Sequence, residues 1–121
     1  MSTMNPANMT ELRDFVEKVR ERTTAFEQGD TDAINARETE IGNFYRRLRA
    51  RGRAAQELLL SLLDDPDLNV RGEAANYVLD FQPDRALPVL EEIAAIPQGR
   101  FAGSCAETSL DLWKSGEYKI A

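Results

Sequence analysis

Apolar residues recur at spacings of three, four and seven along most of the chain, and no useful stretch alternates with a period of two. The first pattern is typical of one face of an α-helix, whereas the second would indicate a half-buried strand. We therefore expect an all-α protein. Glycine, proline and polar residues interrupt the pattern at five places. The helices expected between them occupy roughly residues 10–28, 31–51, 53–63, 68–80, 85–96 and 100–114.

Local signals support these boundaries. Thr10 is expected to cap the first helix, and Gly29 to end it in a left-handed conformation. Asp67 and Asp84 are candidate caps of the fourth and fifth helices, and Pro88 is expected within the first turn of the fifth. The predicted core positions are Leu12, Phe15, Val16, Val19, Phe26, Ile34, Ile41, Phe44, Tyr45, Leu48, Leu58, Leu59, Leu62, Leu63, Val70, Ala74, Ala75, Val78, Leu79, Leu87, Val89, Leu90, Ile93, Ala94, Phe101, Cys105, Ala106, Leu110 and Trp113.

A helical hairpin in residues 57–81 reappears downstream at an offset of about 31 residues. Repeated hairpins cannot bury their apolar faces alone and stack on one another, which predicts a short α-solenoid of about six antiparallel helices. We expect a single domain over residues 1–121, with a disordered lead (1–9), an N-terminal helical cap pair (10–52) and two hairpins (53–116). The repeat maps Leu59, Leu62, Val70, Ala75 and Leu79 onto Leu90, Ile93, Phe101, Ala106 and Leu110.

The net charge of −6 is unevenly distributed along the chain. Residues 1–53 carry ten Lys and Arg against nine Asp and Glu, whereas residues 54–121 carry five against twelve. An acidic surface repels nucleic acid and anionic membranes and favours a basic partner. The sequence shows neither the pattern of a signal peptide nor an apolar run of membrane-spanning length, so we expect a cytoplasmic protein with no membrane partner.

The stretch LLSLLDDPDLNVRGEAANYVL resembles a HEAT-type repeat, in which a leucine-rich helix precedes Asp, Pro, Val-Arg and paired alanines. The resemblance implies an interaction of Asp65 or Asp67 with Arg71. Residues 30–120 are also similar to a family of small bacterial all-helical proteins known as a domain of unknown function, through IGNFYRRLRARG, QPDRALPVLEEIAA and FAGSCAETSLDLWKSGEY. Some members lie near polymorphic toxin and immunity genes, which implies a toxin-neutralising role. The family supplies no catalytic residues.

The residues offer little for catalysis or metal binding. The chain has no histidine, which excludes Ser-His-Asp and Cys-His pairs and most zinc sites. Its single cysteine, Cys105, is expected in the core. Asp65, Asp67 and Asn69 resemble the start of a calcium loop, but Val70 stands where that loop needs glycine, so we interpret them as turn and cap. We predict a protein that is not an enzyme and has no cofactor, metal or catalytic residue.

A basic cluster closes the second helix, and it supports an alternative function. Its arginines complement the helix dipole in the simplest interpretation. The alternative is binding of phosphate or nucleic acid, although the cluster lacks the interleaved aromatic residues of a single-strand platform. This alternative anion-binding set comprises Arg46, Arg47, Arg49, Arg51 and Arg53.

The favoured hypothesis is a protein-protein interaction module, more specifically an immunity protein that binds a basic toxin. We expect it to be a monomer or a weak homodimer. Candidate contacts project outward from the second helix of each hairpin, with Tyr77 as the expected anchor because aromatic residues concentrate interface energy. These partner-binding candidates are Glu73, Asn76, Tyr77, Asp80, Glu107, Asp111 and Lys114.

Overall fold

The computed structural model describes residues 5–97 and 100–120, and within these ranges it contains helices and turns but no strand. The all-α prediction is therefore confirmed. The chain forms two compact units, unit 1 (Met1–Leu58) and unit 2 (Leu59–Ala121). None of the described helices combines the length and apolar character needed to cross a membrane. The solenoid prediction concerns how repeated hairpins stack, and it stays a prediction.

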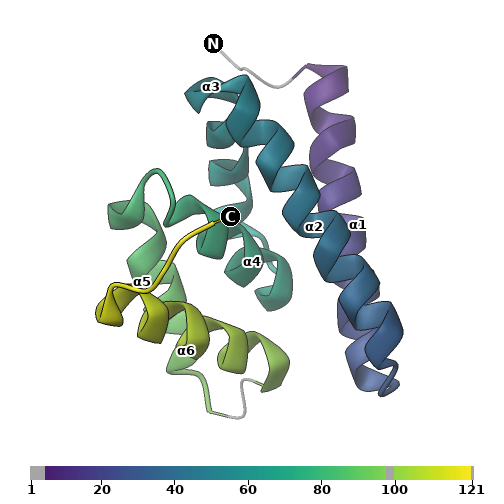
Figure 1. Ribbon diagram of the computed structural model, residues 1–121, viewed down its shortest axis with the longest axis vertical. Coiled ribbons are helices and arrows are strands. Elements are labelled where there is room, and N and C mark those ends of the chain that lie inside the picture. Colours follow the sequence, from purple (N-terminus) through teal and green to yellow (C-terminus); the bar gives the residue numbers. More distant parts are fainter. Residues whose placement is uncertain (1–4, 98–99, 121) are drawn as a thin grey trace. The chain divides into compact units, whose positions relative to one another are not determined.

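Unit 1 is built on two long helices, α1 (Pro6–Glu27) and α2 (Thr31–Arg51), which pack against each other (Figure 1). A short helix, α3 (Arg53–Gln56), follows and packs on α2. The rings of Phe15 on α1 and Phe44 on α2 meet with centroids 5.3 Å apart. Tyr45 is fully buried, and its hydroxyl accepts a hydrogen bond of 2.9 Å from Gln56 Nε2. Unit 1 is thus a helical hairpin with an aromatic centre.

The connection between α1 and α2 confirms the predicted role of Gly29. This glycine has a φ of 69°, and its N–H bonds to the carbonyl of Phe26 while the N–H of Asp30 bonds to that of Ala25. Together these bonds form a Schellman motif, which satisfies carbonyls at the end of a helix. The Asp30 side chain then accepts from the N–H of Ala33 and caps α2. One residue therefore ends one helix and begins the next.

The beginning of α1 differs from the prediction. Asn5 is the cap, because its side chain accepts from the N–H of Asn8 at 2.8 Å, and Pro6 tolerates the first helical position because that N–H is unpaired in any helix. Thr10 lies inside the helix, and its hydroxyl donates to the Pro6 carbonyl. The predicted lead of residues 1–9 is thus helical from Pro6, and residues 1–4 lie outside the described residues. Phe26, expected in the core, is 46% exposed.

The leucine-rich segment is wound more tightly than predicted. Instead of one α-helix over residues 53–63, α3 is followed by a 3₁₀ helix, η1 (Glu57–Asp64). Runs of 3₁₀ helix this long are uncommon. The predicted core leucines of this segment are nevertheless buried: Leu58, Leu59, Leu62 and Leu63.

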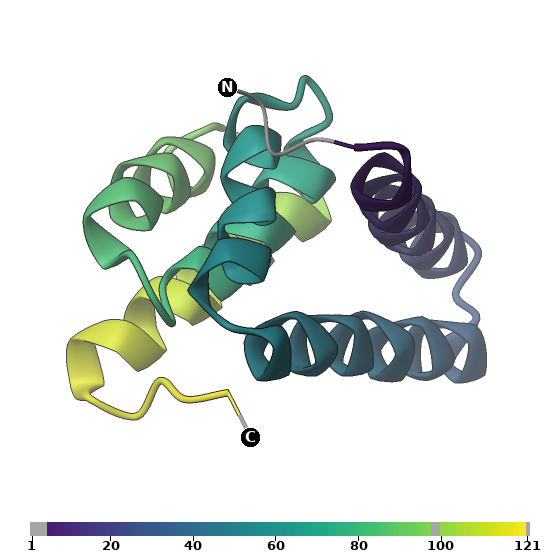
Figure 2. The same ribbon diagram turned by 90° about the horizontal axis from the view of Figure 1, so that it is seen from above.

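Unit 2 contains three α-helices that all pack against one another: α4 (Leu68–Val78), α5 (Pro83–Ala94) and α6 (Arg100–Ser115) (Figures 1 and 2). Small residues allow this close packing, and a Cβ added at Gly72 would lie 3.4 Å from the Cδ1 of Ile93. The fully buried apolar centre includes Val70, Ala74, Ala75 and Val78 from α4, with Ala86, Leu90 and Ile93 from α5.

Helix α5 begins two residues earlier than predicted, because Pro83 occupies its first position and Gln82 is the cap. Asp84, the expected cap, lies in the first turn, where its charge complements the helix dipole. Pro88 consequently lies inside the helix and not in its first turn. Three predicted core residues of α6, namely Phe101, Cys105 and Trp113, are only half-buried.

Candidate partner-binding surface

The predicted contact residues of α4 face inward more than expected. Asn76 Oδ1 accepts a 2.8 Å hydrogen bond from the hydroxyl of Ser109 on α6. Tyr77 is only 7% exposed, so the prediction that it projects outward is wrong. The reason is that α4 packs against both α5 and α6, which leaves little of its circumference free. Glu73 and Asp80 are half-buried.

The predicted contact residues of α6 are exposed. Glu107, Asp111 and Lys114 follow one another at spacings of four and three, which places them on one stripe of the helix. The buried residues Ala106 and Leu110 lie on the other side, toward the core of unit 2. The structure thus divides the predicted surface into an accessible part on α6 and a largely covered part on α4.

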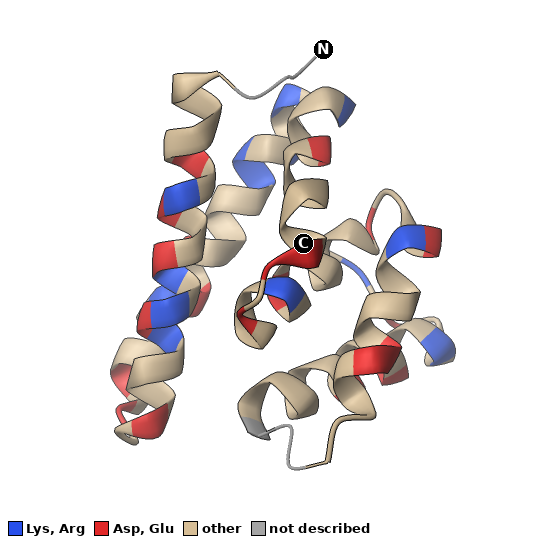
Figure 3. Cartoon of the chain, turned by 180° about the vertical axis from the view of Figure 1, so that it is seen from behind, with Lys and Arg blue, Asp and Glu red and all other residues tan. Residues whose placement is uncertain are grey.

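The charge imbalance follows the division into units. Residues 1–58 carry ten Lys and Arg against ten Asp and Glu, and residues 59–121 carry five against eleven. Unit 2 therefore has the whole net charge of −6, and unit 1 has none. Along α1, positive and negative side chains are interspersed (Figure 3). A basic partner would be attracted to unit 2, since complementary potentials steer association.

The chain reverses direction after α6 (Figure 2). Gly116 has a φ of 80°. Its N–H bonds to the carbonyl of Trp113, and the N–H of Glu117 bonds to the carbonyl of Leu112. These bonds form a second Schellman motif. This turn returns Tyr118 toward α4, where its hydroxyl donates to the backbone carbonyl of Asn76. Segment 117–120 is thus tied to α4 by a hydrogen bond from one of its side chains.

That hydrogen bond satisfies a helix end. The last carbonyls of an α-helix lack partners within the helix. Beyond α4, the N–H groups of Leu79, Asp80 and Phe81 bond to the carbonyls of Ala75, Tyr77 and Val78. None of these three bonds uses the carbonyl of Asn76, which accepts a hydrogen bond from the hydroxyl of Tyr118. Tyr118 therefore acts as a distant cap for α4.

A groove of about 380 Å³ lies beside this segment. We call it the aromatic groove. The rings of Trp113 and Tyr118 meet edge to face, with centroids 5.8 Å apart and an angle of 65°. The helical periodicity places Trp113 in the core and gives no role to Tyr118, although a tyrosine two residues after a glycine that ends a helix is a usable signal. The lining residues are Leu79, Asp80, Phe81, Pro83, Trp113, Tyr118, Lys119 and Ile120.

The arginine cluster does not converge on one site. Arg46 donates to the Asn43 side chain, and Arg51 pairs with Glu11 at 2.5 Å. Arg53 pairs with Glu57 at 3.5 Å. Thus three of the five arginines have acceptors within unit 1, and these acceptors lie on three different helices, α2, α1 and η1.

The other two arginines of the cluster lie near aromatic rings. The guanidinium carbon of Arg47 is 6.0 Å from the Phe44 centroid, and that of Arg49 is 6.0 Å from the Tyr45 centroid. These distances are at the limit of a cation–π contact. Because the cluster is spread around the helix, we favour the acidic unit over it as the functional surface.

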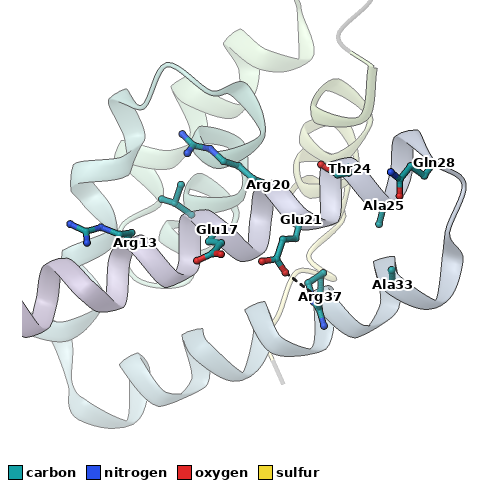
Figure 4. Close-up of a pocket in the computed structure, with 10 residues that line it drawn as sticks. Arg13, Glu17, Arg20, Glu21, Thr24, Ala25, Gln28, Ala33 and Arg37 are labelled. Atoms are coloured by element: carbon teal, nitrogen blue, oxygen red, sulfur yellow. Dashed lines mark hydrogen bonds and ion pairs between the residues drawn. The ribbon is translucent and has the colours of Figure 1, made fainter.

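A second groove, of about 540 Å³, lies within unit 1 between α1 and α2 (Figure 4). Two of its lining residues pair across the helices, since Arg37 of α2 contacts Glu21 of α1 at 3.1 Å. Arg37 also contacts Glu40 of its own helix at 2.5 Å, and Lys18 of α1 contacts Glu40 at 3.2 Å. The hydrogen bond from Lys18 lowers the pKa of Glu40, and the same bond raises the pKa of Lys18. We infer that these ion pairs help to hold α1 and α2 together.

The acidic turn before α4 has the predicted turn-and-cap geometry. The N–H of Asp67 bonds to Asp65 Oδ1, and that of Asn69 bonds to Asp67 Oδ1, both at 2.9 Å. Arg71 pairs with Glu92 of α5 at 3.5 Å. Across residues 5–97 and 100–120, no three His, Cys, Asp or Glu side chains are grouped to hold a metal ion.

Comparison with known proteins establishes the fold but no family. No protein-family model matches the chain. No curated protein matches it either. Among solved structures, it is similar to the crystal structure of the protein RPA1889 from Rhodopseudomonas palustris CGA009. The two are 25% identical over 98% of this chain and 96% of that chain, with a TM-score of 0.82. The chain thus shares its all-helical fold with that protein.

Proposed function

We propose that this protein is a non-enzymatic interaction module that binds a basic partner protein through unit 2. The observation that carries the proposal is the concentration of the whole net charge of −6 on unit 2, with Glu107 and Asp111 exposed on one stripe of α6. Charge complementarity across an interface speeds association and rejects wrong partners. The aromatic groove adds aromatic surface to unit 2, and aromatic residues are enriched at protein-protein interfaces.

In its specific form, the proposal is that the protein neutralises a basic toxin. The resemblance of residues 30–120 to the family with members near toxin and immunity genes supports this form. A binding role requires only an exposed complementary surface, and a stoichiometric blocker needs no catalytic group. The paired charges of unit 1 fit a scaffold that holds the hairpin together.

Affinity capture from native lysate tests the proposal. The informative variant is the double substitution Glu107→Lys/Asp111→Lys, and the matched control is Glu27→Lys/Glu38→Lys, which makes the same charge change at exposed positions of unit 1. We expect the wild type and the control to retain a stoichiometric basic protein that salt releases, because screening weakens exposed charge pairs. The Glu107→Lys/Asp111→Lys variant should lose it.

Equal capture by all three proteins would show that the α6 stripe is not the binding surface. Recovery of nucleic acid, with affinity that falls steeply with salt, would move the function to the arginine cluster. Size-exclusion chromatography of the captured complex would also test the expectation of a monomer or weak homodimer.

A further inference from the structure

The aromatic groove has the chemistry of a site for a positively charged side chain. We propose that it receives an arginine or lysine side chain of the basic partner, held between aromatic rings and the carboxylate of Asp80. The inference rests on the proposed function and adds the class of group that unit 2 recognises. The groove is a separate site from the α6 stripe. No sequence pattern groups its lining residues into one site.

Three aromatic residues from separate parts of the chain meet at this groove. Phe81 follows α4, Trp113 lies on α6 and Tyr118 belongs to the C-terminal segment. All three are half-buried and line the groove. A cation over the face of such rings is attracted by their quadrupole, most strongly by tryptophan. The groove thus offers several ring surfaces to one ligand group.

Asp80 gives the groove a preference for positive charge. It is half-buried and lies in the lining beside Phe81. Lys119 also lines the groove, but it is exposed, so solvent and salt screen its repulsion of a second cation. The surrounding unit carries a net charge of −6, which adds a favourable field. These charges favour a cationic group over a neutral, proline-rich or anionic one.

The walls of the groove are held in place without a ligand. The hydroxyl of Tyr118 is bonded to Asn76, its ring packs against Trp113, and the turn at Gly116 fixes the approach of the segment. A preformed site loses less conformational entropy on binding than one that must be ordered. Tyr118 therefore has two roles, as a cap for α4 and as one wall of the groove.

Trp113 allows the groove to be tested directly, because it is the single tryptophan of the sequence and lies in the lining. Its fluorescence would be followed during titration of the full chain with tetramethylammonium chloride and with N-acetyl-arginine amide. Neopentyl alcohol, which is similar in shape to tetramethylammonium but neutral, is the ligand control. Sodium chloride at matched concentration controls for ionic strength. We expect a saturable change with the two cations and none with the alcohol or the salt.

Two substitutions identify the groups responsible. Asp80→Asn should weaken binding of both cations about tenfold, because it removes a charged partner. Phe81→Leu keeps the apolar bulk and removes the ring face, and should weaken binding about threefold. Asp64→Asn, at an exposed position of unit 2 outside both the groove and the α6 stripe, makes the same chemical change as Asp80→Asn and should leave cation affinity unchanged. Circular dichroism would verify that each variant is folded.

Several results would overturn the assignment. They are equal binding of neopentyl alcohol, equal effects of Asp80→Asn and Asp64→Asn, no effect of Phe81→Leu, or no saturable response to either cation. Binding of a neutral proline-rich peptide in preference to the cations would also overturn it. If the cations fail while capture still depends on Glu107 and Asp111, the proposed function stands without this inference. If the cations bind but no basic partner is captured, the proposed function fails and the cation site remains.

Discussion

Replacing Tyr118 with phenylalanine removes one hydroxyl and tests whether the C-terminal segment stabilises unit 2. That hydroxyl donates to the Asn76 carbonyl at the end of α4. A hydrogen bond within a protein contributes about 0.5–1.5 kcal/mol net. The phenyl ring can keep the edge-to-face contact with Trp113. We therefore expect Tyr118→Phe to lower the free energy of unfolding by about 1 kcal/mol.

Denaturation in urea and by heat, each followed by Trp113 fluorescence and by circular dichroism, measures this change. At about 2.1 cal/mol/K of unfolding entropy per residue, a loss of about 1 kcal/mol lowers the Tm of a 121-residue chain by about 4 °C. If unit 2 unfolds separately, the shift should be about twice as large, because fewer residues share the entropy. The size of the Tm shift thus also reports whether the two units unfold together.

Tyr118→Ala serves as the companion variant. It removes the ring as well as the hydroxyl, and an aromatic pair adds about 0.5–1.5 kcal/mol beyond the area it buries. We expect it to destabilise unit 2 more than Tyr118→Phe does. The reasoning would be refuted if Tyr118→Phe changed the unfolding free energy by less than about 0.5 kcal/mol, which is the range of ordinary surface substitutions.

Three further predictions concern a cap, an ion pair and the core. Asp67→Ala removes the side chain that accepts from the N–H of Asn69, and should cost about 1 kcal/mol in urea denaturation; no loss would contradict the capping role. Glu40 has a lowered pKa through Lys18, so its contribution is present above the ordinary glutamate pKa and is lost as the pH falls through the lowered value. Glu40→Gln should flatten this acid limb of stability against pH, and parallel curves would exclude the effect. Leu90→Ala, at a fully buried position, should cost about 2–5 kcal/mol, and a smaller loss in thermal denaturation would mean that the core of unit 2 repacks.

The sequence predicted the fold class and those boundaries that depend on a distinctive local residue. Gly29 ends α1 with a positive φ, and Asp67 caps α4. It failed where two residues compete for one role. Thr10 and Asn5 can both cap a helix, and the choice of Asn5 depends on Pro6 fitting the first helical position. The sequence also did not predict that the leucine-rich segment forms a 3₁₀ helix, since the same leucine pattern can be buried by an α-helix or a 3₁₀ helix.

The candidate surface was less predictable than the fold. The outward placement of Glu107 and Asp111 followed from the periodicity of α6 and is observed. The predicted outward position of Tyr77 is wrong, because α4 packs against two helices and has no single wide exposed face. The periodicity of a sequence does not show how many helices pack against a given one. The aromatic groove depends on Tyr118, in a segment with no periodicity at all. Its position is set by a turn and one long-range hydrogen bond.

The connection between α1 and α2 has a consequence for how this protein can be engineered. Asp30 uses its backbone N–H to end the first helix and its side chain to start the second. The loop therefore has no residue to spare. Adding even one residue would separate the two tasks and shift the register of the hairpin, whereas asparagine or serine at position 30 could still perform both. Tags, fluorescent labels or new protease sites should be placed elsewhere, because an insertion in this loop would disturb the end of α1 and the start of α2.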